Sequence, residues 1–270
     1  MDLFKKQILP IFLTFTTFLI LITILFFLLF FLNKFTVQDI VLKLNPVDIF
    51  VGLVIYLKTS FDFAIFIVNL MESNLGWQKR IAIEAGTSVG NAGGTILILI
   101  IWIFFKQVPI LLALMIFIAS LVLIQMAQEG LEKFIENSSS SFTKFAQKII
   151  NLIRPINRLS SPLLSKVIPS SKVSNVKPIK FLTLIMFSIT VPFILGLDDF
   201  AGYIPVFSLV NVFGFCSGIF LGHALLNTAL FLSPSKTTKI SKSPLILIIG
   251  SLAFIFIAIY GLVEIFRIFF

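Results

Sequence analysis

The sequence predicts an all-α, polytopic integral membrane protein with about seven transmembrane helices. Of its 270 residues, 58% are hydrophobic, and the mean hydropathy is +1.09. Soluble globular domains are nearer to about 45–50% apolar, so a water-soluble fold is not expected. About seven stretches reach the roughly 20 apolar residues that a spanning helix needs. They cover approximately residues 8–32, 47–71, 85–105, 108–128, 179–202, 206–232 and 244–268.

The first stretch is predicted to be an uncleaved anchor helix within an N-terminal segment, residues 1–35. A signal peptide has an apolar core of only about 7–15 residues that ends in a small-residue cleavage site, and neither feature is present. The other spans form two sets of three, over residues 36–132 and 179–270. A polar, basic segment over residues 133–178 connects the two sets.

The connecting segment is rich in serine, proline and basic residues. Within it, Phe142, Phe145, Ile149 and Ile153 recur on one helical face, which is typical of an amphipathic helix on a membrane surface. The alternative interpretation is a flexible basic linker between two halves of the protein.

The basic residues indicate how the spans are oriented. Most of the 21 Lys and Arg residues fall in segments on one side of the predicted spans, above all in residues 133–178. Because cytoplasmic loops carry such an excess, we expect a plasma (inner) membrane protein with its N-terminus in the cytoplasm and its C-terminus outside. The net charge of +9 is therefore interpreted as membrane orientation, and no nucleic-acid partner is expected.

The two sets of three spans resemble each other. SFDFAIFI at residues 60–67 is similar to LDDFAGYI at 197–204. The last helix of each set also carries a Ser and a Gly, and the spacing between them is the same in both sets. These residues are Ser120 and Gly130 in the first set, and Ser251 and Gly261 in the second. Because each set has an odd number of spans, the second set enters the membrane from the opposite side. Inverted repeats of this kind occur in many secondary transporters, whose substrate site lies at the interface between the repeats. The alternative is that apolar helices resemble each other by composition.

The middle helix of each set carries glycines at four-residue spacing. They are Gly86, Gly90 and Gly94 in the first set, and Gly214, Gly218 and Gly222 in the second. This spacing lets helix backbones approach closely, so helix packing is the role expected of these glycines.

Polar side chains lie beside these glycines and are candidates for an ion-binding site. Glu84 and Asn91 share a face at the start of the first glycine-containing span, and His223 and Asn227 are one helical turn apart in the second. A histidine can change its charge near neutral pH, which suits a proton-coupled step. The alternatives are that His223 is a structural hydrogen-bonding group and that Glu84 lies among the lipid headgroups.

Asp62 lies inside an apolar span, where a carboxylate costs roughly 2.5–3.5 kcal/mol unless it faces a polar interior. It follows Lys58 by four residues, so on a continuous helix the two side chains share a face. They form either a static ion pair or an exchange site at which an incoming cation or proton displaces Lys58. Ser60 adds a hydroxyl group that could coordinate an ion.

Asp198 and Asp199 lie near the end of the predicted span over residues 179–202, and they have no basic residue nearby in the sequence. Consecutive residues of a helix point about 100° apart, so both can serve one site only where the helix is broken or kinked. Pro192 and Gly196 favour such a break. The alternative is that both carboxylates lie at the outer membrane surface.

With its two three-helix repeats and an acidic residue in the first helix of each, the chain resembles the LysE/TerC-type superfamily of small membrane transporters. SFDFA at residues 60–64 is similar to the Ser-x-Asp-Asn-Ala-like element of TerC proteins, with Phe63 in place of the Asn. LDDFA at 197–201 is similar to the acidic element of cadmium-resistance members. The resemblance implies export or handling of metal cations or small solutes. The functional roles that it implies carry over only to Asp62 and Asp199.

These observations predict a proton-coupled secondary transporter that exports or exchanges a metal ion or small cationic solute through acids at the repeat interface. The alternative is a non-transporting scaffold or assembly factor that acts through its basic cytoplasmic segment. An enzyme is not expected, because no HExxH, Gly-x-Gly-Asp or Gly-x-Ser-x-Gly motif is present. One Cys and one His cannot build a Cys/His metal cluster, and no cofactor is expected. The expected partners are the lipid bilayer and the transported solute, and the chain is a candidate for homo-oligomer formation.

Overall fold

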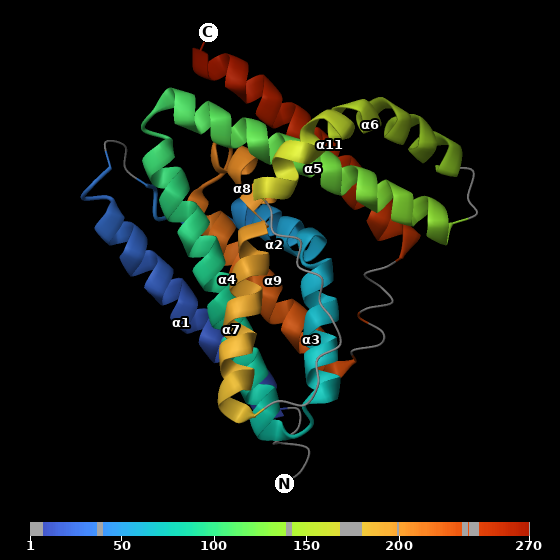
Figure 1. The fold of residues 1–270 in the computed structure, drawn as a ribbon. Helices are drawn as coiled ribbons and strands as arrows, with labels where there is room; N and C mark the ends of the chain where they lie inside the picture. Colours follow the sequence, from blue (N-terminus) through green and yellow to red (C-terminus); the bar gives the residue numbers. More distant parts are fainter. Residues whose placement is uncertain are drawn as a thin grey trace. The chain divides into compact units, whose positions relative to one another are not determined.

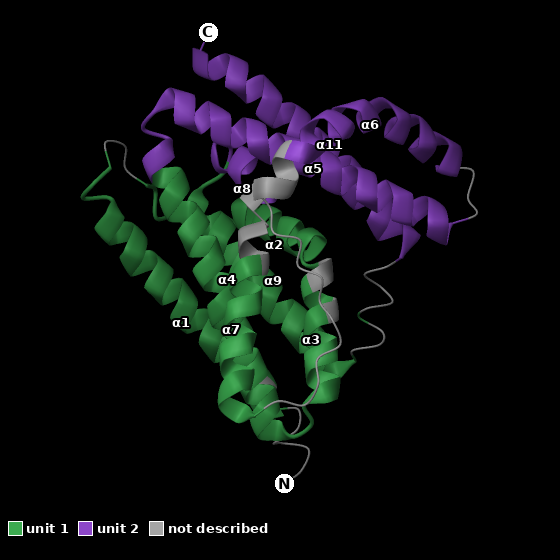
Figure 2. Ribbon diagram, viewed as in Figure 1, with its two compact units in different colours: residues 1–103, 172–199, 210–238 green, residues 104–171, 200–209, 239–270 purple. Residues whose placement is uncertain are grey.

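The computed structural model describes residues 8–36, 40–138, 142–167, 180–198, 200–233, 237 and 243–269. The elements in these ranges are all α-helices (Figure 1). The chain divides into two compact units, coloured separately in Figure 2. Unit 1 comprises residues 1–103, 172–199 and 210–238, and unit 2 comprises residues 104–171, 200–209 and 239–270. Each unit therefore combines segments from both predicted sets of spans.

Five of the described helices are long and apolar enough to cross a membrane. They are α1 (Leu9–Leu32), α4 (Trp77–Phe105), α5 (Pro109–Asn137), α9 (Val212–Leu232) and α11 (Pro244–Phe269). All five coincide with predicted spans. The protein is thus a helical membrane protein, as its hydropathy predicted.

The predicted span over residues 47–71 differs from one continuous helix. It is divided into α2 (Pro46–Thr59) and α3 (Phe61–Ser73), because Ser60 has ψ of 24°, which departs from helical geometry. The 14 residues of α2 rise only about 21 Å, less than the roughly 30 Å of a bilayer core. Lys58 and Asp62 therefore belong to different helices, and the assumption that they share one unbroken helix face is wrong.

The predicted span over residues 179–202 corresponds to α7 (Phe181–Asp198) and α8 (Phe200–Phe207). The residue between them, Asp199, lies outside the described residues. Pro192 is accommodated inside α7, and Pro205 inside α8.

Helix α9 is the central helix of unit 1. In α9, 72% of the most apolar stretch is buried, compared with 17% in α1. Helices α1, α2 and α3 contact α9, and α4 is joined to it by a hydrogen bond between Ser88 and His223. Asn211 caps the start of α9 by accepting from the Gly214 amide, and its side chain also donates to the carbonyl of Val41. This bond ties the segment that leads into α2 to the start of α9.

Glycines allow two pairs of helices in unit 1 to pack with their backbones in contact. A Cβ at Gly218 of α9 would strike the carbonyl oxygen of Ile49 in α2 and lie 2.8 Å from its carbon. A Cβ at Gly90 of α4 would likewise strike the carbonyl oxygen of Ile189 in α7. Both glycines are at positions where the sequence predicted close packing, and a larger side chain would separate the helices.

In unit 2, α5 and α11 pack along each other through two matching contacts. A Cβ at Gly130 of α5 would strike the Ser251 hydroxyl oxygen of α11, and a Cβ at Gly261 of α11 would lie 2.5 Å from the Ser120 hydroxyl oxygen of α5. The same residue types thus meet in both directions across one helix pair.

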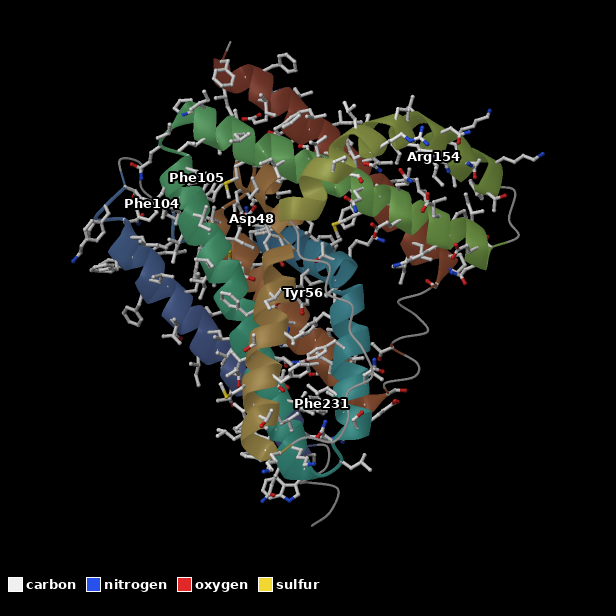
Figure 3. All side chains as sticks on the ribbon, in the orientation of Figure 1. Asp48, Tyr56, Phe104, Phe105, Arg154 and Phe231 are labelled. Atoms are coloured by element: carbon white, nitrogen blue, oxygen red, sulfur yellow. The ribbon has the colours of Figure 1, made fainter. Side chains whose placement is uncertain are left out.

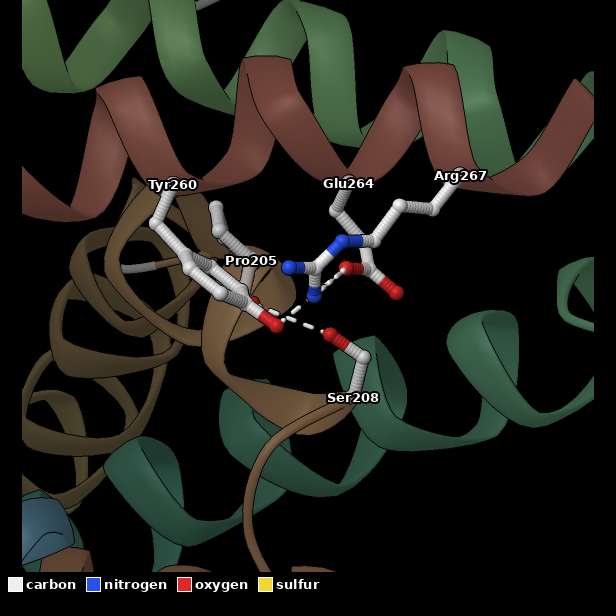
Figure 4. A network of polar contacts seen from close by, with 5 residues as sticks. All are labelled: Pro205, Ser208, Tyr260, Glu264 and Arg267. Atoms are coloured by element: carbon white, nitrogen blue, oxygen red, sulfur yellow. Dashed lines mark hydrogen bonds and ion pairs between the residues drawn. The ribbon is translucent and has the colours of Figure 1, made fainter. Parts of the chain in front are cut away.

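The remaining helices of unit 2 pack on this pair. Helix α6 (Phe142–Val167) lies along α5, and α8 contacts both α5 and α11. At the end of α8, Ser208 lies beside the Tyr260 hydroxyl of α11 and donates to the backbone carbonyl of Pro205 over 3.3 Å. Tyr260 also donates to Glu264 over 3.2 Å, and Glu264 forms a 3.4 Å ion pair with Arg267 (Figure 4). This network is half exposed and fixes the end of α8 against α11.

Candidate functional site

A group of buried polar side chains joins α2, α4 and α9 inside unit 1. Its centre is His223 of α9, whose ring is 3% exposed. The Nδ1 atom of His223 lies 2.7 Å from the hydroxyl oxygen of Tyr56, and the Nε2 atom lies 3.1 Å from that of Ser88. Tyr56 is labelled in Figure 3. Three helices that are distant in the sequence therefore meet at one imidazole ring.

Both nitrogens of the His223 ring have polar neighbours. The Nδ2 atom of Asn227, one helical turn further along α9, lies 3.0 Å from Nε2 of His223. A neutral imidazole donates at one nitrogen and accepts at the other, and both nitrogens of His223 have a polar partner. The ring therefore links Tyr56 on one side with Ser88 and Asn227 on the other, which suits a proton relay.

The polar group continues from Asn227 to the backbone of Glu84 on α4. The Nδ2 atom of Asn227 lies 3.5 Å from the Thr87 hydroxyl oxygen, and that hydroxyl donates to the backbone carbonyl of Glu84 over 3.0 Å. One turn before Glu84, the Arg80 guanidinium lies 5.6 Å from the ring centroid of Phe231 in α9, so this stretch of α4 faces α9. Phe231 is labelled in Figure 3.

The side chain of Glu84 is buried without a partner. It is 1% exposed, and neither carboxylate oxygen has a hydrogen-bond partner within the described ranges. Burial of an unpaired carboxylate is costly by several kcal/mol or more, so the group is expected to bind a proton or to meet a cation. This is the chemical feature that distinguishes the group from a set of structural hydrogen bonds.

A small pocket opens beside His223, between α1, α4 and α9. It has room for about one water molecule. It is lined by Thr14, Phe18, Leu21, Ser88, Asn91, Phe220, His223 and Ala224. The amide nitrogen of Asn91 is buried and has no hydrogen-bond partner among the residues that the structure describes. A water molecule in this pocket would satisfy Asn91 and extend the polar group toward α1.

The structure brings several predicted site residues together. His223 and Asn227 are hydrogen bonded, Asn91 lines the same pocket as His223, and Glu84 lies on the α4 face that meets α9. Ser60 is buried at the break between α2 and α3, and its hydroxyl has no hydrogen-bond partner in the described ranges.

The acidic residues that the sequence emphasised are not placed. The side chains of Asp62 and Asp198, and the whole of Asp199, lie outside what the structure describes. Lys58 is half-buried in the last turn of α2. No group of three or more His, Cys, Asp or Glu residues that could hold a metal ion occurs among the described residues. The described part of the site therefore offers one carboxyl group, one imidazole and several hydroxyl and amide groups.

Tyr56 is the member of the site that sequence reasoning missed. It is fully buried, and its ring lies edge-on to the His223 ring at a centroid distance of 5.8 Å. Phe63 of α3 also contacts that ring, at 5.1 Å. One signal was present, because Tyr56 carries a hydroxyl group in an apolar span and precedes Ser60 by one helical turn.

Comparison of the chain with protein-family models, with curated proteins and with solved structures gives no match. The fold and the buried polar group together define the class: a helical membrane protein with a polar, titratable interior in unit 1.

Proposed function

We propose that the protein is a proton-coupled secondary transporter of a metal ion or small cationic solute, and that Glu84 is its proton-exchanging acid. The observation that carries the proposal is the burial of Glu84 without a hydrogen-bond partner among the described residues, on the helix face that meets His223 and Asn227. An acid inside a membrane helix is costly to retain, and such residues commonly mark ion pathways and proton relays.

In this proposal Glu84 exchanges a proton for a cation. A cation that reaches Glu84 displaces the proton of its carboxyl group, and the released proton is transferred to water. The protonation of Glu84 thereby couples to occupancy of the site. Asp62 and Asp199 remain proposed cation ligands, and the N-terminus of the chain is proposed to lie in the cytoplasm.

The proposed architecture is two inverted repeats, residues 36–132 and 179–270, after an added N-terminal helix. The reciprocal contacts of α5 and α11 support it, because equivalent residues related by a two-fold axis must meet in both directions. The backbone contacts of α9 with α2 and of α4 with α7 support it as well, since each joins the middle helix of one set to the first helix of the other. Inverted repeats of this kind bind their substrates where the repeats meet.

The test is transport by the purified protein in sealed liposomes that contain a pH-sensitive dye. A panel of divalent cations and small organic cations is applied outside, and internal pH and cation uptake are recorded. We expect the wild-type protein to move protons in exchange for at least one cation. Glu84→Gln keeps the shape of the side chain but removes its titration, so coupled flux should fall to the level of empty liposomes.

Glu129→Gln is the matched control, because Glu129 is an exposed glutamate of α5 and the substitution changes the net charge equally. It should retain wild-type flux. Wild-type flux from Glu84→Gln would refute the assignment of Glu84. Absence of flux from the wild-type protein for every cation would refute transport and favour the alternative of a membrane scaffold.

A further inference from the structure

Helix α6 has two apolar stripes, and only one of them is covered. The covered stripe faces α5 and includes Ala146, Ile150 and Ile153. Asn157 continues this stripe and donates from Nδ2 to Gln128 Oε1 of α5 over 2.7 Å. Helix α6 is therefore fixed to α5 along one side.

The second stripe, called here the exposed stripe, lies about a quarter turn around α6 from the covered one. It consists of Phe142, Phe145, Leu152, Ile156 and Leu159. Leu152 and Leu159 are 76% and 88% exposed, which is far more than a large apolar side chain needs to be on a helix that already packs on a neighbour. A continuous exposed apolar surface of this kind marks an interaction site.

The exposed charges of α6 have one sign. Lys144, Lys148, Arg154 and Arg158 are all exposed, and the sequence of α6 contains no acidic residue. Arg154 is labelled on α6 in Figure 3. A helix that combines an exposed apolar stripe with exposed charges of basic sign alone is complementary to lipid acyl chains beneath anionic headgroups.

We propose that α6 lies in the headgroup region of an anionic membrane surface, with the exposed stripe inserted into the acyl boundary and its basic residues on the headgroups. A membrane is the expected occupant of the exposed stripe, because α6 follows directly on α5, a helix that is apolar enough to span the bilayer. This inference does not depend on transport.

The test uses the full-length chain in nanodiscs, with a spin label on a single introduced cysteine. Leu152→Cys and Leu159→Cys place the label on the exposed stripe, and Asn151→Cys places it on the exposed polar side of the same helix. The native Cys216 is buried, and the protein without an introduced cysteine serves as the labelling control. Accessibility to oxygen, which concentrates in lipid, is compared with accessibility to a water-soluble nickel chelate.

We expect labels at Leu152 and Leu159 to be accessible to oxygen and protected from nickel in anionic nanodiscs, and the label at Asn151 to show the reverse. Arg154→Gln with Arg158→Gln should weaken insertion in anionic nanodiscs about fivefold for each charge removed. The matched control, Lys34→Gln with Lys43→Gln, removes two exposed charges outside α6 and should not.

Three results would overturn the proposal. Nickel accessibility at Leu159 equal to that at Asn151 would show that the stripe faces water. Low accessibility to both reagents would show that protein, and not lipid, covers it. Equal insertion with and without Arg154 and Arg158 would show that anionic headgroups are not recognised.

Discussion

Replacement of one glycine of α4 by alanine should separate two packed helices, while the same replacement three residues later should not. At Gly90, the added Cβ would strike the carbonyl oxygen of Ile189 and lie 3.0 Å from its carbon and 3.1 Å from its Cα. These are backbone atoms and cannot rotate away, so α7 must move. At Gly93, the added Cβ would meet only the ring of Phe193, at 3.2 Å, and a ring can shift by a few tenths of an ångström.

The magnitude follows from the comparison of the two variants. Gly90→Ala and Gly93→Ala gain the same helix propensity, about 1 kcal/mol in a soluble helix, so this contribution cancels in their difference. The backbone overlap that remains at Gly90 is a case of overpacking, which typically costs about 1–3 kcal/mol. For a chain of this size, that difference corresponds to a shift of roughly 3–10 °C in the unfolding midpoint.

The protein contains its own reporter of unfolding. Cys216 is its one cysteine and is buried in α9, in the same unit as both glycines. A maleimide dye that fluoresces on reaction should therefore label the detergent-solubilised protein only as this unit opens on heating. We expect Gly93→Ala to unfold at or slightly above the wild-type midpoint and Gly90→Ala below it. Equal midpoints for the two variants would refute the close approach of α4 and α7.

Two further predictions concern buried hydrogen bonds. Tyr56→Phe removes the hydrogen-bond partner of His223 Nδ1 and should lower the free energy of unfolding by about 1–3 kcal/mol. In the same dye assay the thermal unfolding midpoint should fall, and an unchanged midpoint would contradict the hydrogen bond. Asn157→Ala removes the bond to Gln128 and should destabilise the docking of α6 by about 1 kcal/mol. Amide exchange should then rise within α6, whereas Asn151→Ala, on its exposed side, should leave exchange unchanged.

Local sequence was sufficient for most of the helices. The apolar stretches that became α1, α4, α5, α9 and α11 could be found from hydropathy alone, because a run of about 20 apolar residues needs no knowledge of its neighbours. The break at Ser60 could not be found in this way. Its cause is the backbone geometry of one residue inside an apolar run, and hydropathy is insensitive to that geometry.

The helix over residues 142–153 was also predicted, but its faces were not assigned correctly. Phe142, Phe145 and Ile153 were placed on one lipid-facing side. In the structure, Ile153 is buried and Phe142 and Phe145 are exposed. The apolar half of α6 is wide enough to serve two surfaces, and only the position of α5 decides which residues it covers.

For the candidate site, the sequence by itself determined which groups are unusual: a glutamate, a histidine and two asparagines inside apolar helices. Only the tertiary structure decided that Tyr56 pairs with His223, since these residues are 167 positions apart and no local pattern links them. The physical reason is that helix periodicity specifies which face a residue occupies. Which faces then meet depends on close backbone packing, here permitted by glycines that remove the side chains between two helices.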